Sequence, residues 1–249
     1  MKRALEYIFL FLGIEALAGS LIGALLPEQT VLALLTPNII ILVLFFLIKA
    51  FPLRTSYRMK WADLGLFILL AIATLAPSLW MGDIGPQPSH ELQQMMRTVM
   101  ASPLGVIVIT LLAPLVEEIV FRGAIERSLL SWHPFDTRPW AAILLSAAFF
   151  GIAHLDPSQG IHAFLIGILL GWIYWRTSSI LPGLIVHIVN NTSAYAISLF
   201  YPDEDATFQD IVGGDITVSA LLCVLSVILL ATTILLLRKR FIARQAPQK

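Results

Sequence analysis

The sequence predicts an all-α fold, a polytopic membrane helix bundle of about eight transmembrane helices. Of its 249 residues, 58% are hydrophobic and 13% are charged, whereas a soluble domain carries about 25% charged residues. The hydrophobic residues gather in long runs, and an α-helix needs about 20 residues to cross a bilayer. The six tryptophans fall near the ends of these runs, as an interfacial belt of aromatic residues requires.

Eight segments are expected to be helical spans, in chain order 5–26, 31–50, 62–81, 103–130, 139–155, 160–176, 180–200 and 216–237. The first follows Lys2 and Arg3 and resembles a signal peptide. Glu6 and Glu15 interrupt it, however, and apolar residues continue to Leu26, so we expect a retained helix. We divide the chain into N-terminal helices with an interfacial helix (1–100), a core (101–200), and an acidic loop, last span and basic tail (201–249).

The segment before the fourth span is amphipathic. Its apolar residues recur at helical spacing with polar residues between them: Leu92, Met95, Met96, Val99 and Met100. This pattern predicts a helix in the outer interface or against the bundle. It serves either as a connector or as a flexible, methionine-lined rim through which a substrate enters.

Charged residues predict the orientation of the chain, because basic residues accumulate on the cytoplasmic side. With eight crossings, one side collects Lys2, Arg3, Lys49, Arg54, Arg58, Lys60, Arg127, Arg138, Arg176 and the basic tail from Arg238 to Lys249. The other side collects Glu28, Asp83, Asp156, Asp203, Glu204, Asp205, Asp210 and Asp215, with Arg97 as its basic residue. We therefore expect a multi-pass protein of the cell membrane with both termini in the cytoplasm; a plastid membrane remains an alternative.

Three polar pairs interrupt the apolar spans at i, i+4 spacing: Glu118 with Arg122, Phe150 with His154, and His187 with Asn191. Residues four apart share one face of a helix. Ionisable groups are expensive in a bilayer and tend to face the bundle interior. We therefore expect the three polar faces to line one active-site cavity inside the bundle.

Glu117 and Glu118 are adjacent but point in directions about 100° apart on a helix. Glu118 has a pairing partner in Arg122, four residues later. Glu117 has no charged residue at three or four positions on either side, so its carboxylate is suited to take a proton from water and return it later. Pro114, three residues before Glu117, favours a kink there because it removes a backbone hydrogen bond.

His154 and His187 supply a second chemical ingredient, as bases, water-orienting groups, metal ligands or donors to an oxyanion. Asn191 adds a neutral donor suited to an oxyanion hole, and Asn190 is a possible substitute at i+3 from His187. Together these groups suit the hydrolysis of an amide by activated water. The alternatives are a proton-coupled transporter, a bacteriocin-immunity-like protein that binds peptides without cleaving them, and a purely structural polar network.

These motifs resemble those of the intramembrane proteases that include the Rce1-type CAAX prenyl proteases and their bacterial CPBP (Abi) relatives. The family pattern is Glu-Glu-x-x-x-Arg, then Phe-x-x-x-His, then His-x-x-x-Asn, in the order and spacing found here over residues 100–200. The resemblance implies that Glu117 and His154 activate water, that His187 and Asn191 stabilise the oxyanion, and that Glu118 and Arg122 support the site.

The cofactor is left open by the sequence. Glu117, His154 and His187 could hold a divalent metal such as zinc, but the His-Glu-x-x-His signature of zincins is absent. We favour metal-free catalysis slightly. The expected partners are the lipid bilayer and a membrane-associated protein or peptide substrate, with a prenylated one as an option. The net charge of zero suggests no nucleic-acid partner.

Overall fold

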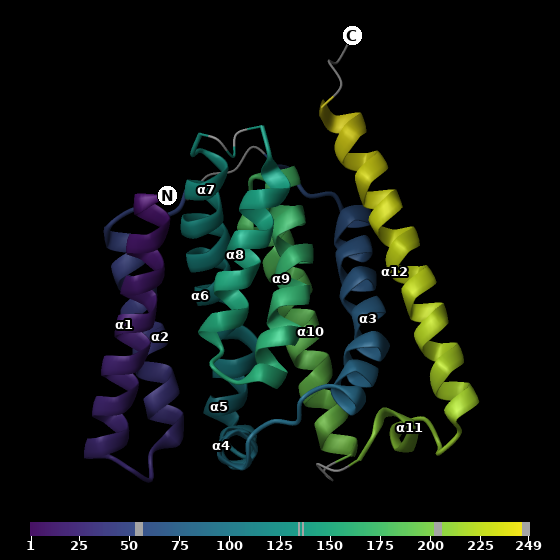
Figure 1. Ribbon diagram of the computed structural model, residues 1–249, viewed down its shortest axis with the longest axis horizontal. Helices are drawn as coiled ribbons and strands as arrows, with labels where there is room; N and C mark the ends of the chain where they lie inside the picture. The colour runs from purple at the N-terminus through teal and green to yellow at the C-terminus, as the bar shows by residue number, and fades with distance from the viewer. Residues whose placement is uncertain (53–56, 134, 136, 202–205, 246–249) are drawn as a thin grey trace. The chain divides into compact units, whose positions relative to one another are not determined.

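The computed structural model describes residues 1–52, 57–133, 135, 137–201 and 206–245. All regular secondary structure within these ranges is helical, as the sequence predicts (Figure 1). The chain forms two compact units, Met1–Ser56 with Pro88–Leu184 and Tyr57–Gln87 with Ile185–Lys249. Arg54, the acidic residues 203–205 and Lys249, which enter the predicted orientation, lie outside the described residues.

The first unit contains two helical hairpins and one long helical segment between them in the chain. Its elements are α1 (Lys2–Leu25), α2 (Thr30–Leu47), α4 (His90–Met100), α5 (Pro103–Ile107), η1 (Val108–Leu112), α6 (Ala113–Glu117), η2 (Glu118–Glu126), α7 (Arg127–Leu130), α8 (Pro139–Ala153), α9 (Pro157–Thr177) and the start of α10 (Ile180–Phe200). The α1–α2 and α8–α9 pairs run antiparallel (Figure 1). The amphipathic helix α4 forms as predicted and packs against α2 and α5, with Val99 buried.

The second unit contains α3 (Trp61–Ile84), the remainder of α10, α11 (Phe208–Ile211) and α12 (Ile216–Gln245). Helices α3 and α12 pack along one another. At one end of this pair, Nη1 of Arg240 lies 3.0 Å from Oδ1 of the buried Asp63. At the other end, the backbone N–H of Phe208 donates to the Asp83 carboxylate. A polar contact therefore joins α3 to α12 at one end of the pair, and another joins α3 to α11 at the other end.

Seven helices among the described residues are long and apolar enough to cross a membrane, and the protein is accordingly a multi-pass membrane protein. They correspond to all the predicted spans except 139–155. That span forms α8, an apolar helix of 15 residues, or about 22 Å at 1.5 Å per residue. Consistent with its shortness, the α8–α9 turn stops short of the α1–α2 turn in Figure 1.

The fourth span is one continuous helical segment, but two stretches of it, η1 and η2, are π-helical. Proline cannot donate a backbone hydrogen bond, and its ring clashes with the carbonyl four residues earlier. Just before Pro114, the Ala113 N–H donates to the Val108 carbonyl, five residues back rather than four. The wider turn thus accommodates Pro114 inside the span, and π-helical turns of this kind often occur at functional sites.

Candidate active site

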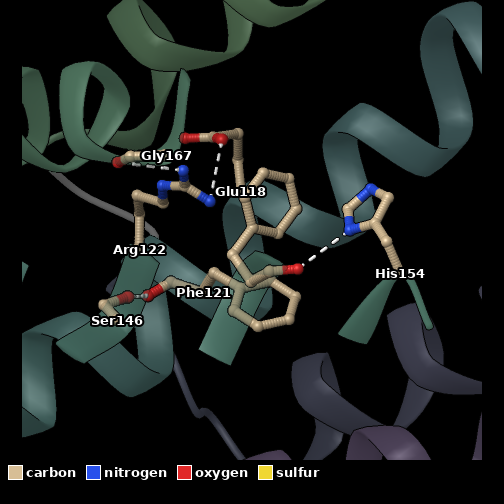
Figure 2. A network of polar contacts seen from close by, with 7 residues as sticks. Glu118, Phe121, Arg122, Ser146, His154 and Gly167 are labelled. Atoms are coloured by element: carbon tan, nitrogen blue, oxygen red, sulfur yellow. Dashed lines mark hydrogen bonds and ion pairs between the residues drawn. The ribbon is translucent and has the colours of Figure 1, made fainter. Parts of the chain in front are cut away.

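The first polar pair forms a buried ion pair. Every residue of η2, from Glu118 to Glu126, is buried. Oε1 of Glu118 lies 3.5 Å from Nη1 of Arg122, and Nη2 of Arg122 donates to the Gly167 carbonyl on α9 at 3.3 Å. Figure 2 shows the guanidinium between these two partners. The expected pairing of Glu118 with Arg122 is therefore confirmed.

A glycine on α10 leaves room for the Glu118 carboxylate. An ideal Cβ built on Gly183 would lie 2.8 Å from Oε2 of Glu118, closer than real Cβ atoms come to other atoms. Any larger side chain would therefore displace the carboxylate or the helix. The first turn of α10, which belongs to the first unit, thus packs directly on the buried ion pair.

Glu117 differs from its neighbour in being only half-buried. Its carboxylate interacts electrostatically with that of Glu15 on α1. Helices α1 and η2 pack together and run antiparallel (Figure 1), with the rings of Phe11 and Phe121 5.2 Å apart. Glu15 follows Phe11 by four residues and Glu117 precedes Phe121 by four, so the same register brings the two glutamates to face each other.

From the sequence alone, Glu15 is not predicted as a site residue and stands out only as an interruption of the first apolar run. A carboxylate inside a membrane span is nevertheless a functional signal in itself. Its neighbour could not be inferred from spacing, because Glu15 and Glu117 lie on helices far apart in the chain. The packing of α1 against η2 supplies that information.

His154 lies just past the end of α8, and Phe150 orients its ring. Nδ1 of His154 is 2.8 Å from the Phe150 carbonyl oxygen (Figure 2). Because a carbonyl oxygen only accepts, Nδ1 carries the proton in this contact, and Nε2 of the neutral ring holds the lone pair. The imidazole also meets the Phe150 ring edge to face at 4.9 Å. His154 is thus oriented with Nε2 available as a base.

Phe150 connects His154 to the buried ion pair. The Arg122 guanidinium carbon lies 4.6 Å from the centre of the Phe150 ring, within range of a cation–π interaction. The same ring lies 4.9 Å from the Phe121 ring. The backbone carbonyl of Phe121 accepts a hydrogen bond from the Ser146 hydroxyl (Figure 2). The first two polar motifs are therefore brought together in one packed network.

The turn after His154 is held by Asp156, which caps two helices. Its carboxylate accepts hydrogen bonds from the N–H groups of Ser158 and Gln159 at the start of α9, and from the N–H of Ser89, the N-cap residue of α4. The hydrogen bond from the Ser158 hydroxyl, with help from these N–H groups, lowers the pKa of Asp156 below its ordinary value. Leu155, which lies between His154 and Asp156, has a φ of 60°, a value that is uncommon outside glycine and asparagine.

The third polar motif lies on α10 in the second unit. His187 is buried and Asn191 is half-buried. The Asn190 side chain donates to Oγ1 of Thr74 on α3 at 3.0 Å, so its amide already links two helices, and Asn191 is the better candidate for an oxyanion donor. That His187 and Asn191 meet Glu117 and His154 in one cavity stays a prediction.

A catalytic zinc site needs three protein ligands and an open position. Glu117 and His154 of the first unit supply two donors, and the third candidate, His187, belongs to the second unit. Within the described ranges no group of three or more His, Cys, Asp and Glu side chains is placed to hold a metal ion. Whether Glu117, His154 and His187 bind a metal together therefore stays a prediction.

Comparison with known proteins agrees with the motifs. Residues 99–193 match the family described as type II CAAX prenyl endopeptidase Rce1-like, a range that contains all three polar motifs. A protein of Bacillus subtilis (strain 168) named "Putative membrane peptidase YdiL" is 29% identical over 161 residues, which cover 62% of this chain and 64% of that protein. The match therefore spans less than two thirds of that relative's length. No solved structure matches the chain significantly. The resemblance to the Rce1-like CAAX prenyl endopeptidases is thus confirmed for residues 99–193.

Proposed function

We propose that this protein is an intramembrane endopeptidase of the CAAX prenyl protease-like type. The observation that carries the proposal is the contrast between two adjacent glutamates, of which Glu118 is linked through Arg122 and Phe150 to an oriented histidine. Glu118 is fully buried and ion-paired, whereas Glu117 is half-buried and His154 has Nε2 available as a base. The similarity of residues 99–193 to Rce1-like endopeptidases supports the same reaction.

In this proposal Glu117 and Nε2 of His154 hold a water molecule and remove one of its protons as its oxygen attacks the carbonyl carbon of the scissile amide. General acid–base catalysis of this kind contributes about 10²–10⁴-fold in rate. The proton then passes to the amide nitrogen as the carbon–nitrogen bond breaks. The products are a new carboxylate and a free amine, which balances the hydrolysis.

The oxyanion of the tetrahedral intermediate needs donors that are already in place, and one such donor contributes about 10²–10³-fold. We assign His187 and Asn191 to this role. Their i, i+4 spacing on α10 gives them one helix face, and α10 starts against Glu118 at Gly183. Glu118 and Arg122 support the site from its buried side.

The substrate in this proposal is a membrane-associated protein or peptide, with a prenylated one as an option. The protein lies in the cell membrane with both termini in the cytoplasm, as the distribution of basic residues favours. Metal-free activation of water is our preferred mechanism, and a divalent metal is the alternative that the experiment separates.

The test is cleavage of a fluorogenic peptide library, with and without prenylated members, by the purified protein in detergent. Wild type is compared with Glu117→Gln and His154→Ala, each with and without a chelator. Two matched controls carry the same substitutions at exposed positions, Glu28→Gln and His133→Ala. We expect both site variants to lose at least about a hundredfold in kcat, and the controls to keep the wild-type rate.

If wild type loses cleavage when the chelator is added, the protein is a metal enzyme and metal-free catalysis is overturned. Equal cleavage by wild type and both site variants would point to a contaminating protease and remove the assignment of Glu117 and His154. If purified wild type cleaves none of the peptides, the endopeptidase proposal fails, and transport of protons or binding of peptides becomes the reading to test.

A further inference from the structure

The end of the α3–α12 pair at which Arg240 meets Asp63 carries an excess of positive charge. Five basic residues lie there, four of them exposed and Arg240 half-buried: Arg58, Lys60, Arg238, Lys239 and Arg240. We call these five residues, together with Asp63, the basic end of the second unit. Asp63 is the one acidic residue among them, so the charges of the described side chains at this end do not balance.

Asp63 fixes the position of Arg240 without neutralising the other cations. Asp63 is almost fully buried, and its Oδ1 lies 3.0 Å from Nη1 of Arg240. Its Oδ2 accepts the backbone N–H of Lys60 at 2.8 Å. Among the described residues of this unit, Asp83 follows Asp63 on α3 by about 30 Å, and the remaining two acidic residues lie in or beside α11 at that far end. One carboxylate therefore serves several cations.

The cations of the two helices lie at one level. The contact between Asp63 and Arg240 joins the start of α3 to the end of α12, so the two helices run antiparallel. Lys60 lies three residues before Asp63, and Lys239 adjoins Arg240. Each is therefore within about one helical turn, roughly 5.4 Å, of the ion pair. Cations from both helices thus lie beside a single guanidinium that is held in place.

Aromatic and apolar residues mark the basic end as a boundary between the hydrocarbon core and the lipid headgroups. Trp61, the first residue of α3, is 88% exposed, and tryptophan is favoured at that boundary. Leu235 and Leu236 are exposed just before Arg238 on α12, where they offer an apolar surface to acyl chains. The exposed surface of α12 thus changes from apolar to basic within one turn. The bilayer itself is therefore the nearest source of anions for this end.

Phosphate is the anion that these side chains suit. A guanidinium group binds phosphate oxygens with parallel N–H donors, and an ammonium group acts as a point charge. Clusters of basic residues directly beyond a transmembrane helix attract the anionic lipids of the cytoplasmic leaflet, and the distribution of basic residues predicts that this end is cytoplasmic.

We propose that the basic end binds the phosphate group of an anionic phospholipid. Arg240, held by Asp63, is the positioned donor, and Lys60 and Lys239 add one cation from each helix. A phosphate bound there offsets the repulsion among the cations and links the start of α3 to the end of α12. This inference does not depend on the peptidase activity proposed above.

The test is thermal unfolding of the purified protein in detergent micelles that contain either anionic phosphatidylglycerol or zwitterionic phosphatidylcholine. A ligand that binds only the folded state raises the unfolding temperature. We expect phosphatidylglycerol to raise it by about 4 °C or more relative to phosphatidylcholine. Salt at about 1 M should remove the difference, because it screens charges beyond about 3 Å. Native mass spectrometry should show phosphatidylglycerol retained on the wild type.

Paired substitutions locate the site. Lys60→Gln/Lys239→Gln removes one exposed cation from each helix and leaves the Asp63–Arg240 pair intact. We expect it to lose about half of the phosphatidylglycerol effect or more, whereas Lys60→Arg/Lys239→Arg, which keeps both charges, should retain the effect. Lys2→Gln/Arg3→Gln removes two exposed positive charges from α1, on the same predicted side. It is the matched control and should respond like wild type.

Four results would overturn the proposal. Equal unfolding temperatures in the two lipids would show that the protein does not select an anionic headgroup. An undiminished response of Lys60→Gln/Lys239→Gln, or an equal loss in Lys2→Gln/Arg3→Gln, would show that the attraction is not localised at the basic end. Stabilisation by soluble glycerol phosphate as large as that by phosphatidylglycerol would assign the site to free phosphates instead of lipids.

Discussion

At the scale of single residues, adjacent positions in one motif have different environments. Glu117 and Glu118 differ by about 100° in direction around the helix. The Glu117 carboxylate is half-buried and interacts electrostatically with Glu15. The Glu118 carboxylate is fully buried against Arg122 and Gly183. The sequence motif Glu-Glu thus divides into an accessible group and a buried group, and the two should respond differently to the same substitution.

We expect Glu118→Gln to lower the free energy of unfolding by about 3–5 kcal/mol, because removing one partner leaves a buried guanidinium poorly compensated. Glu117→Gln should change it by less than about 1 kcal/mol, as for a substitution outside a buried network. Unfolding of both variants in detergent, followed by circular dichroism, measures the difference. Equal destabilisation by the two substitutions would contradict the division of roles.

Gly183→Ala tests the close contact between α10 and the ion pair. The added methyl group would meet Oε2 of Glu118 at 2.8 Å, so we expect destabilisation of about 1–3 kcal/mol from overpacking together with reduced peptide cleavage. Gly65→Ala is the control, because an ideal Cβ there has nothing within 4 Å. Alanine in the α3 helix should instead stabilise by about 0.5–1 kcal/mol. If Gly183→Ala behaves like Gly65→Ala, the contact does not constrain Glu118.

At the scale of elements, the long segment 103–130 and the α8–α9 turn position the site. The segment changes from α-helix to π-helix and back around Pro114 and Glu117, and the Ser146 hydroxyl of α8 bonds the Phe121 carbonyl of η2. The turn holds His154 between the end of α8 and the capped start of α9. The long segment has π-helical stretches and the turn has Leu155 at a φ of 60°, and unusual backbone of this kind is common near functional groups.

Asp156 makes the stability of the folded protein depend on pH, and the sign of this dependence follows from the lowered pKa of its carboxyl group. The ionised carboxylate is favoured in the folded state. Its contribution is therefore fully present above the pKa of the unfolded chain and is lost as pH falls through the lower pKa of the folded state. We expect Asp156→Ala to destabilise the protein by about 1 kcal/mol at neutral pH, as for loss of a helix cap, and by progressively less under acid conditions.

Asp156→Asn is the matched variant, because its side-chain oxygen still caps the helix but does not ionise. It should retain most of the neutral-pH stability without the acid-dependent loss at this position. Thermal unfolding of the three proteins between neutral and strongly acidic pH makes the comparison. If the difference in unfolding temperature between wild type and Asp156→Asn stays constant across this range, the carboxylate charge is not the source of the acid-dependent loss of stability.

At the scale of the whole molecule, the prediction concerns the orientation in the membrane. Cys223 is the single cysteine of the chain and is buried in α12. In a Cys223→Ala background, we expect Lys2→Cys and Lys239→Cys to react with a membrane-impermeant maleimide only after permeabilisation of cells. Glu28→Cys and Asp215→Cys should react in intact cells. Reaction of the Lys2→Cys and Lys239→Cys proteins on opposite sides would contradict an even number of crossings.

The sequence by itself determined that the protein spans a membrane, where its helices lie, and which polar residues pair within one helix of the candidate site. Apolar run length and residue spacing are local properties, so they predicted the spans to within about three residues, except that the last helix extends to Gln245 instead of ending at 237. They also predicted the Glu118–Arg122 pair within one helical segment. The same local reasoning set His154 one turn after Phe150, and the structure shows their direct contact.

Only the tertiary structure decided which helix faces meet. It brought Glu15 opposite Glu117, fitted Glu118 and Glu126 against glycines on α10 and α9, and gave Asp156 two helices to cap. These features depend on packing between segments distant in the chain, whereas helical periodicity relates only neighbouring residues. That is why the sequence alone identified the motifs but not the partners that hold them.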